Sequence, residues 1–137
     1  MIEIHEGEAP MFQGLDVFRM SSAMAKHAGE RQALISQNVA NADTPDYKAR
    51  DLPEFKSVFM PEAGGAQRAT RAGHLHGVSA DGMVMSPEEI RDEASLNGNQ
   101  VSLETEMLKS VSAQRDHDRA LAIYKSSLSV LRTAIRS

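Results

Sequence analysis

The last third of the chain carries the pattern that most restricts its fold. Between Val101 and Arg136, one set of positions recurs at alternating steps of four and three residues. These positions are Leu103, Met107, Ser110, Gln114, His117, Leu121, Tyr124, Leu128, Leu131 and Ile135. Steps of four and three return to one side of an α-helix and are the period of a coiled-coil seam. Residues 101–137 are therefore predicted to form one long helix that packs against another helix.

The residues at both ends of this stretch favour the same helix. Ser102 is a good N-cap residue, and Glu104 and Glu106 fall in the first turn, where the helix dipole favours negative charge. Arg132 and Arg136 fall in the last turns, where positive charge is favoured. The predicted helix thus has defined ends as well as a seam.

A second helical pattern covers residues 14–42, after an N-terminal segment, residues 1–13, that is predicted to be flexible. Its seam positions are Val17, Met20, Met24, His27, Arg31, Leu34 and Asn38. On the opposite side lie small residues such as Ala25, Gly29 and Ala33. Small side chains either let another helix approach closely or simply favour helix formation, and the sequence leaves both readings open.

Both seams are polar in the middle, at His27 and Arg31 in the first and at Ser110, Gln114 and His117 in the second. If the chain turns back on itself, the helices are antiparallel and these polar centres lie roughly opposite each other. Polar seam residues specify register and partner, or else they extend to solvent. Ordering two long helices costs backbone entropy that few large apolar side chains offset, so the pair is predicted to pack against further copies.

The middle segment, residues 43–100, shows neither helical pattern and is predicted to be irregular. Residues 51–59 suit a short amphipathic turn, residues 75–85 suit a small β-hairpin around Asp-Gly, and residues 86–89 suit the start of a short helix. Asn-Gly-Asn at 97–99 breaks the chain before the last helix. The predicted fold class is mainly α, with long N- and C-terminal helices paired as an antiparallel, coiled-coil-like hairpin and an irregular middle.

Composition excludes several classes of function. The formal net charge of −4 and the pI of about 5.7 argue against a nucleic-acid partner, which requires a basic face. Without cysteine there is no disulfide, thiolate metal site or cysteine nucleophile. The N-terminal sequence MIEIHEGEAP has no apolar core of a signal peptide. No stretch approaches the roughly 20 apolar residues of a membrane span, so none is predicted.

Candidate catalytic patterns are weak. His74 and His76 are spaced as two metal ligands on a strand, but no third ligand follows at a recognisable spacing. Asp116, His117 and Asp118 resemble a charge relay only in order, because successive residues of a helix point in different directions. The chain contains no GxSxG, glycine-rich phosphate loop or HExxH. We therefore predict no catalytic, metal or cofactor site.

The most specific local feature is the stretch QNVANADTPDYKARDL at residues 37–52. Asn38 and Asn41 lie where a helix would end, and Pro45 disfavours helical geometry at Thr44. The run from Thr44 to Tyr47 fits a β-turn with proline in second position. Local chemistry explains why a helix stops here, but not why two asparagines, a proline and a tyrosine are all used.

This corner resembles the signature of the axial proteins of the bacterial flagellum, in which Asn-x-Ala-Asn precedes Thr-Pro-Gly-Tyr-Lys-Ala. The most similar family is that of the FlgB proximal rod proteins of the basal body. Thr70 and His74 fit its Thr-x-x-x-His element, and NGNQVSLETEM at 97–107 resembles its Asp-Gly-Asn-Asn-Val-x-Leu-x-x-Glu-Met entry to the last helix. The ending LSVLRTAIRS also resembles that family.

A sister family, the FlgC-type rod proteins, shares the corner and is the alternative. It usually has Pro-Asn-Val before the last helix, whereas this chain has Gly98-Asn99-Gln100-Val101 without proline. The chain also departs from the FlgB pattern at Asp46, where the family usually has glycine. A type II turn needs φ above zero at this position, and a type I turn does not, so the turn type is left open.

The resemblance implies a structural, non-enzymatic rod subunit without a cofactor. Copies would assemble helically with each other and with other rod proteins, up to the junction with the MS ring. They would form a shaft that crosses the periplasm and transmits motor torque to the hook. The flagellar type III apparatus would export the chain without cleaving a signal peptide. A soluble helical adaptor that binds one partner without polymerising is the alternative from another class.

The assembly interface is predicted from the two seams and the corner. Its residues are Val17, Met20, Met24, Leu34, Asn38, Asn41, Thr44, Pro45, Tyr47, Met107, Leu121, Tyr124, Leu128, Leu131 and Ile135. The corner residues among them are predicted to fix the direction in which the chain leaves the inner helix towards a neighbouring subunit.

Overall fold

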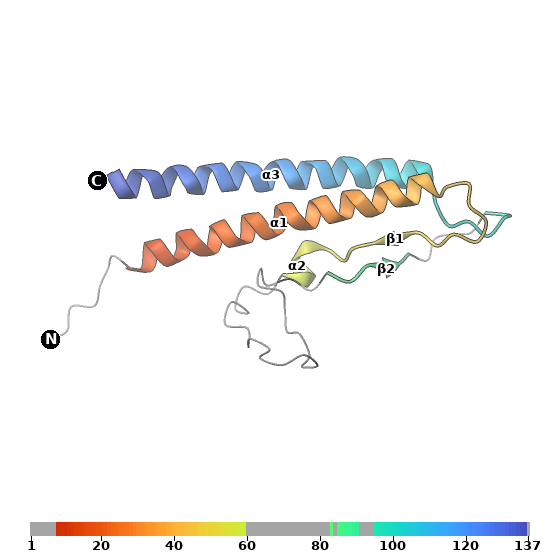
Figure 1. Ribbon diagram of the computed structural model, residues 1–137, viewed down its shortest axis with the longest axis horizontal. Coiled ribbons are helices and arrows are strands. Elements are labelled where there is room, and N and C mark those ends of the chain that lie inside the picture. Colours follow the sequence, from red (N-terminus) through yellow and green to blue (C-terminus); the bar gives the residue numbers. More distant parts are fainter. Residues whose placement is uncertain (1–7, 60–82, 84, 91–94, 137) are drawn as a thin grey trace, which may run out of the picture.

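The computed structural model describes residues 8–59, 83, 85–90 and 95–136, with side chains of the first helix described from Gly14 onward. Two long helices, α1 (Glu8–Ala40) and α3 (Leu103–Arg136), run side by side along the molecule (Figure 1). Between them in sequence lie β1 (Arg50–Asp51), α2 (Phe55–Val58) and β2 (Glu88–Glu89). The chain runs back along α1 through β1 and α2 and returns through the antiparallel β2 to the corner, where α3 begins (Figure 1). The start of α1 and the end of α3 therefore lie at the same end (Figure 1).

The two long helices are antiparallel, which confirms the predicted hairpin. Contacts between them pair rising numbers on α1 with falling numbers on α3. At the terminal end, the rings of Phe18 and Tyr124 are 4.3 Å apart between centroids. Closer to the corner, the Gln32 side-chain amide donates to Ser110 Oγ at 3.0 Å, and closer still the Asn38 side-chain amide donates to Glu106 Oε2 at 3.0 Å.

Small side chains form most of the buried rows of this helix pair. On α1, Ser21, Ala28 and Ile35 are buried at heptad spacing, and on α3 the buried row consists of Glu106, Ala113 and Ala120. Alanine lets helix axes approach closely, because little side chain stands between the backbones. The close approach therefore uses small residues rather than the large apolar ones of the predicted seams.

The predicted seam of α3 is consequently half right. Ser110, His117, Tyr124, Leu128 and Leu131 are partly buried, as a position next to the partner helix requires. The other half of the seam is wrong, because the alanine row takes its place against α1. Leu103, Met107, Gln114, Leu121 and Ile135 are exposed. The exposed fraction is 69% for Met107 and 84% for Ile135.

The middle segment is fixed to the helices by a small antiparallel sheet. Arg50 of β1 pairs with Glu89 of β2, and Asp51 pairs with Glu88. The predicted helix start at residues 86–89 is therefore wrong. The Ile90 amide donates to the carbonyl of Ala49 at 2.8 Å, so long-range pairing overrides the local capping pattern.

Other predictions for the middle segment have mixed outcomes. The expected turn at 51–59 contains α2, whose Val58 is buried, and Phe59 forms an antiparallel bridge with Met83. Most of the expected hairpin at 75–85 lies outside the described residues. None of the described helices combines the length and the apolar character of a membrane span.

Candidate functional site

The corner after α1 is a β-turn with a left-handed residue. The Tyr47 amide donates to the carbonyl of Thr44 at 3.3 Å and closes the turn. Asp46 has φ of 59°, which is the geometry a type II turn requires at this position and a type I turn does not allow. Aspartate tolerates this region better than most residues, because its short side chain bonds locally. The open question of turn type is thus answered in favour of positive φ.

A second stretch of chain, residues 97–100, is hydrogen-bonded to this corner. The buried Asn99 amide donates to the carbonyls of Asn41 at 2.9 Å and Thr44 at 2.6 Å. The backbone N–H of Gln100 donates to the Tyr47 carbonyl at 3.0 Å, and the backbone N–H of Asp46 donates to the backbone carbonyl of Asn97 at 3.1 Å. The two most specific motifs of the sequence therefore form one unit, which we name the neck (residues 41–47 and 97–100).

Asn38 connects the neck to both helices, and only 1% of it is exposed. Its amide nitrogen donates to the Arg50 carbonyl at 2.8 Å and to Glu106 Oε2 at 3.0 Å. Its side-chain oxygen accepts from the Arg50 amide at 3.1 Å and from the Tyr47 hydroxyl at 3.2 Å. All four hydrogen bonds of the amide group are made, so one side chain fixes the path of the chain from Tyr47 to Arg50.

Four charged side chains extend this arrangement into a neutral network. Glu106, of which 1% is exposed, accepts from Lys109 Nζ at 3.1 Å, and Lys109 also lies 3.8 Å from Asp51. Arg31 donates two parallel hydrogen bonds to Asp51, at 2.9 and 3.1 Å. The hydrogen bond that Arg31 donates to Asp51 raises the pKa of the Arg31 guanidinium, whereas burial lowers it. Two positive and two negative groups thus compensate each other in a largely dry site.

We name Asn38, Glu106, Lys109, Asp51 and Arg31 the polar node. The sequence relates Glu106 only to the helix dipole and Asp51 only to the short turn at 51–59, and it indicates no role for Lys109. The signal for the node is long range: residues of α1, β1 and α3 converge, and no local pattern relates them. The reading in which Arg31 extends to solvent is wrong, because its side chain is held by Asp51.

His27 also faces the middle segment rather than the other helix. It is buried, its Nε2 lies 2.8 Å from the Pro53 carbonyl oxygen, and its ring meets the edge of Phe55 at 5.7 Å between centroids. The reading in which His27 extends to solvent is therefore wrong as well. The contact expected between two polar seam centres is made by Gln32 and Ser110 instead.

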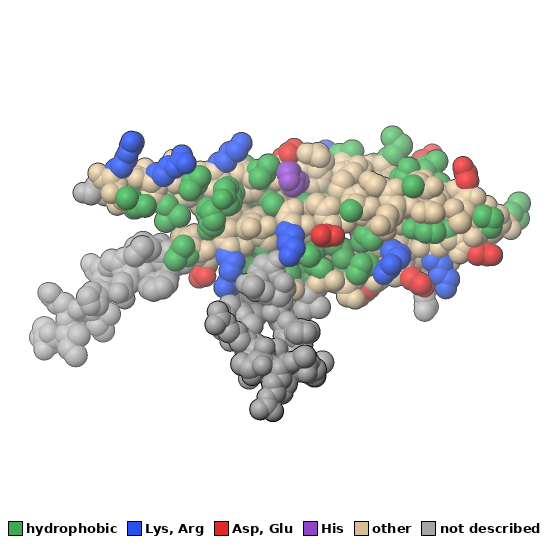
Figure 2. Space-filling model, viewed as in Figure 1, with side chains coloured by type: hydrophobic (Ala, Val, Ile, Leu, Met, Phe, Trp, Pro, Cys, Tyr) green, Lys and Arg blue, Asp and Glu red, His purple; other side chains and the backbone are tan. Residues whose placement is uncertain are grey.

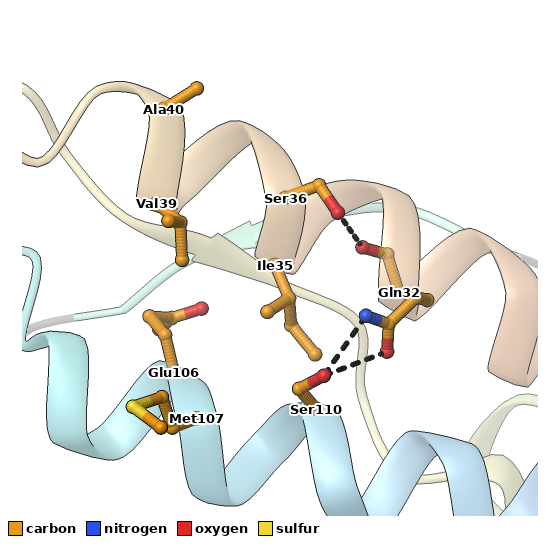
Figure 3. Close-up of a pocket in the computed structure, with 8 residues that line it drawn as sticks. All are labelled: Gln32, Ile35, Ser36, Val39, Ala40, Glu106, Met107 and Ser110. Carbon is orange, nitrogen blue, oxygen red and sulfur yellow. Dashed lines mark hydrogen bonds between the residues drawn. The ribbon is translucent and has the colours of Figure 1, made fainter.

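An open groove lies between the helices beside the polar node. Ile35 and Val39 of α1 face Glu106, Met107 and Ser110 of α3 across a space of about 340 Å³ (Figure 3). The hydrogen bonds between Gln32 and Ser110 close one end of it (Figure 3). The walls are mainly aliphatic, so this groove can accept an apolar side chain.

The residues predicted for assembly fall into three groups by exposure. Asn38 is buried within the subunit. The partly buried residues are Met20, Met24, Leu34, Asn41, Tyr47, Tyr124, Leu128 and Leu131. The exposed ones are Val17, Thr44, Pro45, Met107, Leu121 and Ile135. Further large apolar residues that the prediction did not name are exposed beside them, including Val39, Leu108, Val111 and Val130.

The described part of the chain contains no group of three or more His, Cys, Asp or Glu side chains that could hold a metal ion. His74 and His76 lie outside that part. His117 Nδ1 is 3.9 Å from Asp118, while Asp116 pairs with Arg119, so the three residues do not converge. The polar groups that do converge are those of the neck and the polar node, where they bond each other.

Comparison with known proteins gives a consistent result. No protein-family model matches the chain. A flagellar basal body rod protein FlgB of Agrobacterium fabrum is 27% identical over 118 residues, which are 83% of this chain and 88% of that protein. The protein of the same name from Cereibacter sphaeroides is 32% identical over 108 residues, or 77% and 83% of the two chains. The one from Salmonella typhimurium is 31% identical over 110 residues, or 72% and 78%. The chain belongs to the FlgB family of flagellar basal body rod proteins.

Proposed function

We propose that this chain is a non-catalytic structural subunit of the flagellar rod. It packs helically with copies of itself and with other rod proteins, and the resulting shaft crosses the periplasm and transmits motor torque to the hook. Family membership supports the rod as its location. The observation that carries the proposal is a row of large exposed apolar side chains on α3, which begins at the groove and which we name the outer row (Met107, Leu108 and Val111).

The packing of α1 on α3 does not bury the outer row, so its side chains remain available to contact another molecule. Met107, Leu108 and Val111 are all exposed, although α1 and α3 are closed against each other by the alanine row. Met107 and Val111 are four residues apart on a helix, and Leu108 and Val111 are three apart, so the three side chains are neighbours. Contiguous exposed apolar side chains mark interaction surfaces.

The polar node supports a mechanical role. A shaft transmits torque only if each subunit resists bending where its chain changes direction. The corner is held by the four hydrogen bonds of Asn38 and by the two that Asn99 donates. A turn fixed at this many points has few alternative paths, and the neck would therefore follow the helices as one body.

Partners and route follow from the same proposal. As a rod subunit the chain would contact other rod components and the junction between the rod and the MS ring. It would pass through the flagellar type III export apparatus. These statements rest on the family to which the chain belongs.

A paired substitution tests the assembly role. Met107→Asp places a charge in the exposed apolar row, and Ser112→Asp places the same charge at an exposed polar position of α3. We expect Met107→Asp to abolish rods and swimming with unchanged helix content and protein level, while Ser112→Asp swims normally. The measurements are swimming in soft agar and electron microscopy of purified basal bodies.

Two outcomes would overturn the proposal. One is a Met107→Asp strain that swims and carries normal rods. The other is the absence of the unsubstituted chain from purified rods while it is recovered bound to one soluble partner, which would favour the adaptor.

A further inference from the structure

The neck contains the one Asn-Gly pair of the sequence, Asn97 and Gly98. It lies at the end of the molecule opposite to the start of α1 and the end of α3 (Figure 1). We propose that Asn97 is a modification site, at which the side-chain amide is lost by reaction with the backbone nitrogen of Gly98. The closed neck blocks this reaction and an open neck permits it. The proposal concerns the chemistry and the closure of the neck, and it does not depend on the rod role.

The reaction needs only water as a co-reactant. The backbone nitrogen of Gly98 attacks Cγ of Asn97, the Cγ–Nδ2 bond breaks, and the proton of the attacking nitrogen leaves with Nδ2 as ammonia. A cyclic succinimide remains, in which the Gly98 nitrogen is bonded to two carbonyl carbons. Water adds to one of these carbons and breaks its bond to that nitrogen. Glycine favours the attack, because it has no Cβ to shield its nitrogen.

In the closed neck, hydrogen bonds hold both reacting groups. The Gly98 N–H donates to the Ser95 carbonyl at 2.9 Å, so the attacking nitrogen is engaged and keeps its proton. The side-chain oxygen of Asn97 accepts from the Asn99 N–H at 3.1 Å and from the Ser95 hydroxyl. The backbone carbonyl of Asn97 accepts from the Asp46 N–H at 3.1 Å. Attack therefore requires the turn at 95–98 to open first.

The fold does not use the amide nitrogen that the reaction removes. Within the described part of the chain, the side-chain hydrogen bonds of Asn97 all involve Oδ1 and none involves Nδ2. Asn97 is also exposed, so water reaches it. Figure 2 shows polar and backbone atoms at the surface of this end of the molecule, among hydrophobic and acidic side chains. Loss of ammonia thus removes no hydrogen bond that holds the neck.

The two products have different effects on the neck. Addition of water at Cγ gives aspartate, which keeps an oxygen in the place of Oδ1 and can accept the same two hydrogen bonds. Addition at the backbone carbonyl carbon gives isoaspartate, in which the main chain runs through Cγ and is longer by one methylene group. The carbonyl that accepts from Asp46 then becomes a free carboxylate. Gly98 cannot absorb the extra length, because its φ is 78° and the Asp46 carboxylate lies against it. A chain with isoaspartate therefore does not close the neck.

Ageing of the full chain tests the site. Purified protein is kept at mildly alkaline pH, either folded in buffer or unfolded in guanidinium chloride. Peptide mapping by mass spectrometry follows the replacement of NH2 by OH at Asn97. We expect this reaction to be at least about tenfold slower in the folded chain, because it waits for local opening. Asn97→Gln should stay unmodified in both conditions, because its longer side chain forms the ring much less readily.

Two alanine variants separate opening of the neck from a general loss of stability. Asn99→Ala removes the hydrogen bonds to the carbonyls of Asn41 and Thr44, so the reaction at Asn97 in buffer should accelerate several-fold. Phe18→Ala is the matched control, because it removes a ring contact in the other half of the helix pair and should leave this rate unchanged. Circular dichroism checks that both variants remain helical.

Hydrogen exchange tests the difference between the products. The Asn97→Asp variant should retain slow exchange at the N–H groups of Asp46 and Gln100. Aged and refolded chains with isoaspartate, separated by chromatography and identified with an isoaspartyl methyltransferase, should lose this protection. Peptide mapping distinguishes isoaspartate at position 97 from any that forms at Asp81-Gly82.

Each arm has an outcome that overturns its part of the inference. No mass change at Asn97 in the unfolded chain overturns the site itself. Equal rates in the folded and unfolded chain, or equal acceleration by Phe18→Ala and Asn99→Ala, overturn protection by the neck. Fast exchange at Asp46 in Asn97→Asp overturns the difference between the products. All of these outcomes leave the rod role intact, which the assembly experiment with Met107→Asp tests separately.

Discussion

The corner half and the terminal half of the helix pair are held by different kinds of contact. Near the corner, the polar node and the neck bury amide and charged groups whose hydrogen bonds are met within the subunit. Towards the termini, Phe18 lies on Tyr124, and Leu131 packs beside Gly14. Polar contacts are directional and apolar contacts are not. The corner half therefore sets one geometry, while the terminal half can adjust to what packs on it.

The largest expected effect comes from breaking the corner half at its centre. Asn38→Ala removes four hydrogen bonds and leaves the Glu106 carboxylate and the Arg50 backbone groups without that partner. Buried groups left unpaired cost about 1–3 kcal/mol each, so we expect the free energy of unfolding to fall by about 3 kcal/mol. Urea denaturation followed by circular dichroism measures it.

Gln37→Ala is the matched control for this substitution. Gln37 precedes Asn38 on α1 and its side chain is exposed, so its removal should change the free energy of unfolding by less than about 0.5 kcal/mol. A similar decrease in the free energy of unfolding in both variants would contradict this expectation, because the effect of Asn38→Ala would then be no larger than a change in helix propensity.

A smaller and more local effect is expected from the terminal half. Phe18→Ala removes the ring that contacts Tyr124, at a position that is only partly buried. We expect a loss of about 1–2 kcal/mol, below the usual cost for a fully buried phenylalanine. Hydrogen exchange should accelerate in the first turns of α1 and the last turns of α3, and protection around Asn99 should be unchanged. Uniform acceleration along both helices would remove the distinction between the two halves.

The smallest effect is the part of the cost of Gly98→Ala that depends on the side chain of Asp46 within the neck. Gly98 has φ of 78°, and a Cβ there would overlap the Asp46 carboxylate. We expect Gly98→Ala to cost about 1–2 kcal/mol for the left-handed backbone, plus a term for the overlap. In an Asp46→Gly background the overlap is gone, so the cost of Gly98→Ala should fall. Equal costs in the two backgrounds, measured by chemical denaturation, would show that the contact with Asp46 is irrelevant.

The sequence predicts the helices better than it predicts what lies between them. The four-three spacing identifies α3, and Ser110, His117, Tyr124 and Leu131 do border α1. Met107 and Leu121 are exposed instead, because Ala113 and Ala120 take the inner row and permit closer approach. Alanine suits a helix surface and a helix interface equally, so its position in a sequence does not distinguish the two.

The candidate site shows the same limit at longer range. The corner is recognisable from Asn38, Asn41, Pro45 and Tyr47, and its turn is where the sequence places it. The hydrogen bonds from Asn99 that hold it are not predictable from local pattern, because the corner and the Asn-Gly-Asn motif lie more than fifty residues apart. The composition of each motif is also accounted for by a local turn alone. For the same reason the sequence predicts a helix start at residues 86–89, although Glu88 and Glu89 pair with β1.

The neck has a consequence for how the subunit tolerates change. Asn99 bonds the chain that leaves α1 to the chain that returns to α3. The two ends of the middle segment are therefore held at a nearly fixed distance from each other, whatever lies between them. The entropy of closing a loop rises only slowly with its length. Sequence inserted or exchanged between the two halves of the neck is therefore expected to leave α1 and α3 in register. The middle segment is thus a natural place to attach a foreign domain.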